Sequence, residues 1–204
     1  MKTGRTDFVH LNCHSFYSMP TGGASSPREL AERAKRLGML ALAITDTNGL
    51  YGIPAFLKAA KETGIKPVVG VEIDTTSGSP SPASSETDGE GSLPEEPARL
   101  AQSDMRARCV CIAAGSGGYA ALCRIVTELR LAPRVKLADL LASEAGHIIA
   151  LTPSPVLLKA LRDRMEPGRL FAELHGFPSS LRAMRGVTYG SIRSLCRKPV
   201  LNHI

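Results

Sequence analysis

The chain has 204 residues, a formal net charge of +6, 43% hydrophobic and 22% charged residues, values of a globular protein with a hydrophobic core. No apolar run approaches the roughly eighteen residues of a membrane span, and the N-terminus lacks an apolar signal segment. We therefore expect a soluble, cytoplasmic protein. The five scattered cysteines favour reduced thiols over a disulfide framework.

The first patterned stretch is residues 8–18, FVHLNCHSFYS. Its apolar residues predict the start of a strand, in which alternation would place His10, Asn12 and His14 on one face. A parallel barrel presents metal ligands in this way at the ends of its strands. A partly exposed strand with two incidental histidines explains the same residues equally well.

The following residues predict alternating helices and strands. Ser26-Pro27-Arg28-Glu29 is a capping box, which predicts a helix that ends at Gly38. An apolar strand at 39–44, a helix at 53–63 and a second apolar strand at 67–73 come next. Short links between these elements predict a parallel sheet with right-handed crossovers.

Residues 75–105 interrupt this rhythm, because they are rich in Ser, Pro, Gly and acids and almost devoid of apolar side chains. We predict a flexible, acidic surface insertion within a single domain of residues 1–204. Residues 74–104 carry a net charge of −6, which leaves +12 for the rest of the chain. This positive charge would favour binding to a polyanion or to an acidic partner. A solvated, arginine-rich surface explains it equally well.

Further strand and helix patterns follow the insertion. We predict strands at 109–114, 147–151, 170–174 and from 199, and helices at 119–131, 135–141, 155–164 and 179–196. Six or seven such units predict a distorted β/α barrel of the TIM type, incompletely closed at the C-terminus because the last strand is cut short. Cys109 and Cys111 share one strand face and have no CxxC partner, which favours core cysteines over a zinc site.

Candidate metal ligands lie in or after successive predicted strands. They are His14, Asp46 and Glu72, followed by His10, Asn12, Glu173, His175 and His203. Imidazoles and carboxylates at successive strand ends are typical of a polynuclear metal site that hydrolyses phosphoesters. The neutral side chains of Asn12, Thr47 and Asn48 are poor ligands for a transition metal, and a lone strand-end aspartate is often only a helix cap.

Three segments, FVHLNCHSFYSM, GMLALAITDTNGLYG and GIKPVVGVEI, resemble the opening motifs of the PHP (polymerase and histidinol phosphatase) domain. The form of the PHP domain that these segments resemble is the one found in bacterial DNA polymerase III alpha subunits. GYAALCRIVTELRL, LADLLASEAGHIIALT and RLFAELHG continue the resemblance, which covers nearly the whole chain except 75–105. Stand-alone PHP phosphatases share the His/Asp motifs but lack the Gly-Tyr helix. The resemblance implies a TIM-like barrel of the PHP type.

The resemblance also implies an eroded metal site. An active PHP site opens with His-x-His, and its first histidine falls on Asn12 and its second on His14. The Thr-Asp-His-x-Gly motif keeps Asp46 but has Thr47 at the histidine position, and Glu72 matches the acid of Gly-x-Glu. A further family histidine lies near His175, and the final Asn-Asp-x-His motif around His203 is not intact. The remaining ligands could hold at most one weakly bound divalent metal (Zn, Mn or Mg).

The leading interpretation is a PHP domain, as a fragment or truncated copy of a DNA polymerase III alpha-type chain, with a structural or partner-binding role in DNA replication. Its partners would be the remainder of that chain or other replication proteins, with DNA contacted indirectly and no membrane. No polymerase active site is present. The alternative is a stand-alone metal-dependent phosphoesterase or 3'-5' exonuclease of the same fold. A nucleic-acid-binding module is a third interpretation, which the 4% aromatic content does not favour.

Overall fold

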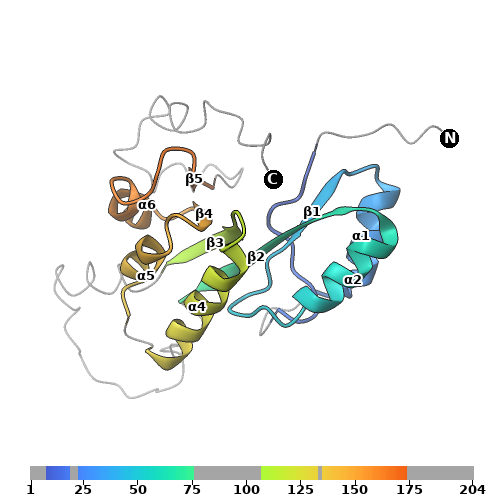
Figure 1. The fold of residues 1–204 in the computed structure, drawn as a ribbon, viewed down its shortest axis with the longest axis horizontal. Coiled ribbons are helices and arrows are strands. Elements are labelled where there is room, and N and C mark those ends of the chain that lie inside the picture. The colour runs from blue at the N-terminus through green and yellow to red at the C-terminus, as the bar shows by residue number, and fades with distance from the viewer. Residues whose placement is uncertain (1–7, 19–22, 76–106, 133–134, 174–204) are drawn as a thin grey trace, which may run out of the picture.

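The structure, a computed structural model, describes residues 8–18, 23–75, 107–132 and 135–173 (Figure 1). These residues form a mixed α/β fold around a five-stranded sheet with the strand order β1-β2-β3-β4-β5. The elements are α1 (Pro27–Arg36), β1 (Ala41–Ile44), α2 (Ile53–Thr63), β2 (Lys66–Asp74), β3 (Arg108–Ala113), α4 (Gly118–Leu131), α5 (Leu137–Ser143), β4 (Ile148–Thr152), α6 (Pro155–Leu161) and β5 (Leu170–Ala172). Within the described residues, no helix is both long and apolar enough to cross a bilayer.

The parallel pairing predicted for the strands at 39–44 and 67–73 is confirmed, but the parallel pairing that a β/α barrel implies does not extend to β3. β1 pairs with β2 and β4 with β5 in parallel, but β3 is antiparallel to both β2 and β4. The chain re-enters the sheet beside the point where β2 ends, since Thr75 N donates to Ala107 O (3.2 Å). Two helices, α4 and α5, separate β3 from β4. Helix α4 leads away from the end of β3, and α5 leads back towards it. β4 then begins beside the end of β3, where Ala114 N donates to His147 O (2.9 Å).

The sheet is open within the described residues. The helix and strand that we predict at 179–196 and from 199 lie outside these residues, as does most of the 75–105 insertion. Closure into a barrel therefore stays a prediction.

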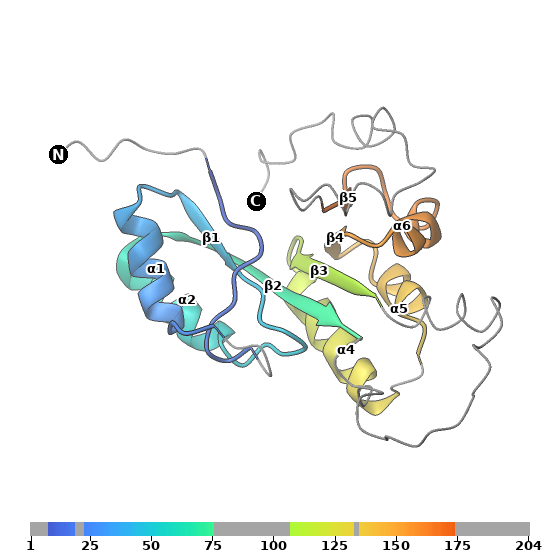
Figure 2. The same cartoon turned by 180° about the vertical axis from the view of Figure 1, so that it is seen from behind.

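The N-terminal segment does not form the regular strand that its sequence predicts. It lies beside β1, where Ala43 N donates to His10 O and Thr45 N donates to Cys13 O, both at 2.9 Å. Figure 2 shows this dark blue segment running past β1. Three steps along the segment match two steps along β1, and this mismatch breaks the alternation. The common face predicted for His10, Asn12 and His14 is therefore not formed.

Helix α1 begins and ends as predicted. Ser26 Oγ accepts a hydrogen bond from Glu29 N (3.2 Å), and Glu29 Oε2 accepts one from Ser26 N (2.7 Å), which completes the capping box. Gly38 has a φ of 76°, a left-handed conformation that glycine adopts at little cost after a helix.

We expect Ser26→Ala to lower the free energy of unfolding by about 1 kcal/mol, because it removes an acceptor for an otherwise unpaired helix N–H. Urea denaturation followed by circular dichroism would measure the change. Ser25→Ala is the matched control, since Ser25 precedes the cap and accepts from Phe16 N (3.0 Å) through its backbone carbonyl, which alanine retains. Equal stability of the Ser26→Ala variant and the unmodified protein would contradict the importance of the cap.

The helices cover one face of the sheet in two apolar clusters. One cluster joins α1 and α2 to β1, and its largest member is the fully buried Phe56. The other joins α4, α5 and α6 to β2–β5 and includes Cys109 and Cys111, both 0% exposed, with sulfur atoms 3.8 Å apart. The hydrogen bond to Cys111 and burial raise the pKa of the Cys109 thiol well above its usual value. The prediction of core cysteines is confirmed.

The opposite face of the sheet carries a smaller apolar cluster, against which Val9 of the N-terminal segment packs. Its buried members are Ala41, Ala43, Val68, Val110 and Ile112. Because side chains alternate between the faces of a strand, Glu72 shares this face with Val68, and Arg108 shares it with Val110. The two charged side chains thus lie on the sheet face that the helices leave open.

Candidate functional site

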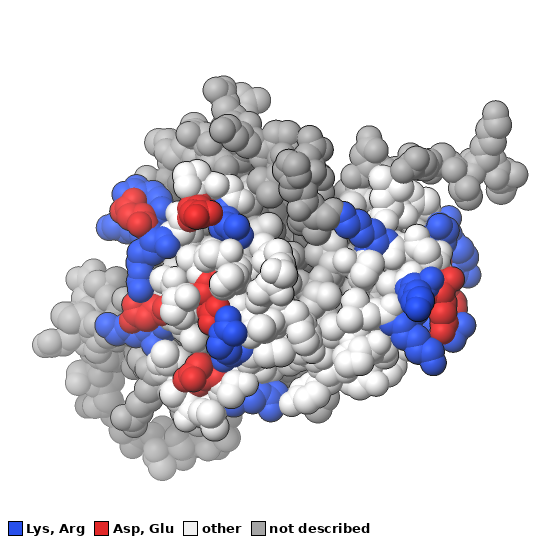
Figure 3. All heavy atoms as spheres, viewed as in Figure 1, with Lys and Arg blue, Asp and Glu red and all other residues white. Residues whose placement is uncertain are grey.

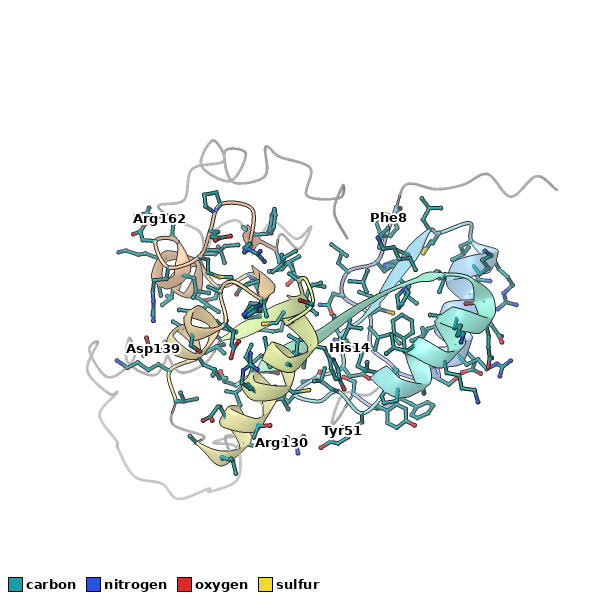
Figure 4. All side chains as sticks on the ribbon, in the orientation of Figure 1. Phe8, His14, Tyr51, Arg130, Asp139 and Arg162 are labelled. Carbon is teal, nitrogen blue, oxygen red and sulfur yellow. The ribbon has the colours of Figure 1, made fainter. Side chains whose placement is uncertain are left out.

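The candidate site lies at one edge of the sheet, where β2, β4 and β5 end and β3 begins. Thr47, just after β1, pairs with Glu72 of β2 in an isolated parallel bridge. Thr152 Oγ1, at the end of β4, donates to the carbonyl of Arg108 (2.6 Å), and Glu173 N donates to Thr152 O (3.0 Å). Figure 4 shows His14 in the middle of the molecule, beside β2. Segments far apart in sequence therefore meet at this edge.

Asp46 is 1% exposed and anchors the N-terminal segment. Its Oδ1 accepts a hydrogen bond from Ser15 N (2.7 Å), and its Oδ2 accepts one from Ser15 Oγ (2.8 Å). A side chain at Gly52 would place its Cβ 2.6 Å from Asp46 Oδ2, so only glycine fits at this position without a shift. Both carboxylate oxygens of Asp46 are thus engaged by the protein's own donors.

The neutral residues of the site form a second set of hydrogen bonds. Asn12 Oδ1 accepts from Thr45 Oγ1 (2.8 Å). Ser18 Oγ donates to Thr47 Oγ1 and accepts from Thr47 N, both at 2.9 Å, and it lies 3.3 Å from His14 Nδ1. Asn12 and Thr47 therefore hold the N-terminal segment against the end of β1.

Glu72, only 3% exposed, lies at the centre of a row of charged side chains. Its Oε2 is 2.6 Å from His14 Nε2, and its Oε1 is 2.8 Å from Arg108 Nε. A second guanidinium nitrogen of Arg108 is 3.6 Å from Glu173 Oε2. His14, Glu72, Arg108 and Glu173, which we call the charged row, join the N-terminal segment to β2, β3 and the end of β5.

Of the other predicted ligands, the structure places His10 away from the charged row. His10 is exposed and packs against the ring of Phe8, with ring centroids 4.7 Å apart. His175 and His203 lie outside the described residues. Sequence reasoning missed Arg108, for which the only signal is an arginine that opens an otherwise apolar strand.

The arrangement of these side chains bears on whether the site could hold a metal ion. Within the described part of the chain, no group of three or more His, Cys, Asp or Glu side chains is arranged to hold a metal. Both oxygens of Asp46 accept hydrogen bonds, and Glu72 lies between an imidazole and a guanidinium. Burial and, to a lesser extent, the charge of Asp46 raise the pKa of the nearby Cys13 thiol, which disfavours the thiolate that a metal would need.

On the face drawn in Figure 3, the charged side chains of the described residues form no continuous basic stripe. Blue and red side chains in Figure 3 lie close together over the half that contains α4, α5 and α6, and much of the centre is uncharged. Binding to a phosphate backbone favours a continuous basic stripe. This face has charges of both signs instead.

Comparison with known proteins identifies relatives. The PHP domain family matches residues 10–169. The error-prone DNA polymerase of Nocardia farcinica is 32% identical in an alignment that covers 87% of this chain and 17% of that protein. DNA polymerase III subunit alpha of Buchnera aphidicola subsp. Schizaphis graminum is 48% identical over 67 residues, which cover 33% of this chain and 6% of that protein. The chain thus spans less than a fifth of the length of either relative.

Among solved structures, an amidohydrolase from Chromobacterium violaceum has a TM-score of 0.36 and 20% identity, covering 68% of this chain and 36% of that one. A likeness this distant carries no argument about function. The family match, by contrast, extends over well more than half of the sequence. The chain therefore belongs to the PHP domain family and is homologous to the PHP regions of bacterial DNA polymerase III alpha subunits and error-prone DNA polymerases.

Proposed function

We propose that this chain acts as the PHP domain of a DNA polymerase III alpha-type chain, with an eroded metal site that serves as a structural brace and not as a hydrolase. The observation that carries the proposal is that Ser15 donates to both oxygens of Asp46 and that charged side chains flank Glu72 on both sides. These flanking side chains are His14 and Arg108.

A hydrolytic cluster needs anionic and imidazole donors around two or more cations, roughly 3.5–4 Å apart in two-metal sites. At the two positions where the PHP motifs carry histidines, this chain has Asn12 and Thr47. Each makes a hydrogen bond that stabilises the N-terminal segment. The surviving ligands, His14, Asp46 and Glu72, would hold at most about one divalent ion (Zn, Mn or Mg), and loosely.

A bracing role agrees with the span of these contacts. Ser15 and Asp46 are 31 positions apart, and Ser18 and Thr47 are 29 apart, so the site connects distant parts of the chain. Buried hydrogen-bond networks of this kind fix one arrangement of the backbone. The proposal includes a single domain of residues 1–204 with an acidic insertion at 75–105 and a TIM-like, incompletely closed barrel.

The partners in this proposal are the remainder of a polymerase chain or other replication proteins, with DNA contacted through them. Two observations support this. The relatives are DNA polymerases of which this chain covers less than a fifth, and the charges on the visible surface are of mixed sign.

Metal analysis tests the proposal. After incubation with Mn²⁺ or Zn²⁺ and desalting, we expect at most about one ion per chain, and no turnover of a phosphate ester or of single-stranded DNA above background. Asn12→His together with Thr47→His should raise metal affinity, because each change supplies an imidazole in place of a weak ligand. His10→Ala is the control and should change neither property.

The opposite result would favour the alternative, a metal-dependent phosphoesterase or exonuclease. Two or three tightly held ions in the unmodified protein, with ester hydrolysis that His14→Ala abolishes, would overturn the structural role.

A further inference from the structure

Arg108 is a cationic side chain within the candidate site, and it contacts two of the site's acids. Its Nε is 2.8 Å from Glu72 Oε1, and another of its nitrogens is 3.6 Å from Glu173 Oε2. The other oxygen of Glu72 is 2.6 Å from His14 Nε2. Glu72 thus lies between an imidazole and a guanidinium, and the same guanidinium also approaches Glu173.

Two carboxylates and one imidazole are also a donor set that proteins use for a single divalent cation. A carboxylate as buried as Glu72, at 3% exposed, is costly unless a positive charge compensates it. Guanidinium remains protonated throughout the pH range in which proteins fold, and its planar nitrogens match carboxylate oxygens. Arg108 therefore places a permanent positive charge directly beside the buried carboxylate of Glu72.

Backbone pairing fixes Arg108 in this position. In the antiparallel register, Asp74 is opposite Arg108 and Glu72 is opposite Val110, so Arg108 and Glu72 are diagonal neighbours. The hydrogen bond from Thr152 Oγ1 to the Arg108 carbonyl (2.6 Å) attaches the start of β3 to β4 as well. A long side chain that starts here reaches both Glu72 and Glu173.

We propose that the guanidinium of Arg108 replaces a metal ion in this site, as a built-in cation that neutralises Glu72 and Glu173. The inference rests on the proposed structural role and adds the residue that makes a metal unnecessary. It predicts that loss of the guanidinium opens a site for one divalent cation, with His14, Glu72 and Glu173 as ligands.

The test compares four versions of the full chain: unmodified, Arg108→Met, Arg108→Lys and Arg164→Met. Thermal unfolding is measured in EDTA and in 1 mM Mn²⁺, and Mn²⁺ binding is titrated by electron paramagnetic resonance. In Arg108→Met we expect Mn²⁺ at about 100 times its Kd to raise Tm by roughly 5–10 °C relative to EDTA. The unmodified protein should show no such difference, and Arg108→Lys, which retains a cation, should show little.

Arg164→Met is the matched control, because Arg164 pairs with the exposed Asp139 at 2.7 Å and not with the charged row. Should Arg108→Met not fold in EDTA, refolding is repeated in Mn²⁺. Recovery of the native circular dichroism only with Mn²⁺ supports the inference, and no recovery in either condition contradicts it. A folded Arg108→Met without a metal response, or an equal response in Arg108→Lys, also overturns it.

The outcomes separate the two proposals. Tightly bound ions and ester hydrolysis in the unmodified protein would refute the structural role whatever Arg108 does. An inert unmodified protein, with no gain of metal binding in Arg108→Met, would refute only the role of Arg108.

Discussion

Asp46→Ala is expected to lower the free energy of unfolding by roughly 3–5 kcal/mol, because two hydrogen bonds to a buried carboxylate are lost and two buried donors are left unpaired. The donors are the backbone N–H and the hydroxyl of Ser15, which is itself 0% exposed. Urea denaturation would measure the loss, provided that unfolding is two-state.

Asp163→Ala is the control for this change, because the side chain of Asp163 is 80% exposed and pairs with its neighbour Arg162 on the surface. Its stability should stay within about 0.5 kcal/mol of the unmodified protein. If Asp46→Ala instead kept its stability and lost a bound metal, Asp46 would be a ligand and not an anchor.

Phe56→Ala should have an effect of similar size, about 3–5 kcal/mol, by a different mechanism. Phe56 is 0% exposed in the cluster between α1, α2 and β1, and its loss leaves a cavity lined by apolar side chains. The same denaturation experiment measures the change.

Leu57→Ala provides the comparison on the same helix, since Leu57 is 43% exposed. We expect it to change stability by less than about 0.5–1 kcal/mol. An equal loss from the two substitutions would mean that helix propensity, and not the cavity, determines the effect.

The local elements could be predicted well from the sequence because their signals are local. The capping box at Ser26 and the left-handed Gly38 mark the limits of α1, and the predicted helix at 53–63 is α2 with the same bounds. Continuous apolar runs indicated β1–β4 to within a few residues. Short-range chemistry decides these features, so a single sequence is sufficient.

The direction of β3 could not be predicted, because it depends on where the chain returns. Regular helix and strand alternation suggested parallel pairing throughout, but the segment after β2 returns at the same edge and α4 and α5 form an outward and a return leg. The prediction of a regular strand in the N-terminal segment was wrong for a related reason. Side chains alternate between two faces only in a regular strand. His10 and Cys13 are three residues apart. They bond to Ala43 and Thr45, which are two apart, so this segment is not regular.

The antiparallel β3 also explains why the candidate site was only half anticipated. His14 and Glu72 are in contact, and Glu72 N donates to Asp46 O (3.2 Å), so these three predicted residues do lie near one another. Arg108 was not anticipated because a parallel barrel places its site at the C-terminal ends of strands, and Arg108 begins β3. In this sheet, the first residue of an antiparallel strand reaches the same edge.

The contacts between Thr75 and Ala107 have a consequence for the length of the chain between them. Besides the bond between their backbones, Ala107 N donates to Thr75 Oγ1 (2.9 Å), and Thr75 Oγ1 donates to Ala107 O (3.1 Å). The entropic cost of closing a flexible loop grows only with the logarithm of its length, by about 0.6 kcal/mol for each doubling. With both ends fastened in this way, the sheet is almost insensitive to how many residues pass between them. This junction is accordingly a natural place to insert a fluorescent or affinity label without disturbing the pairing of β2 with β3.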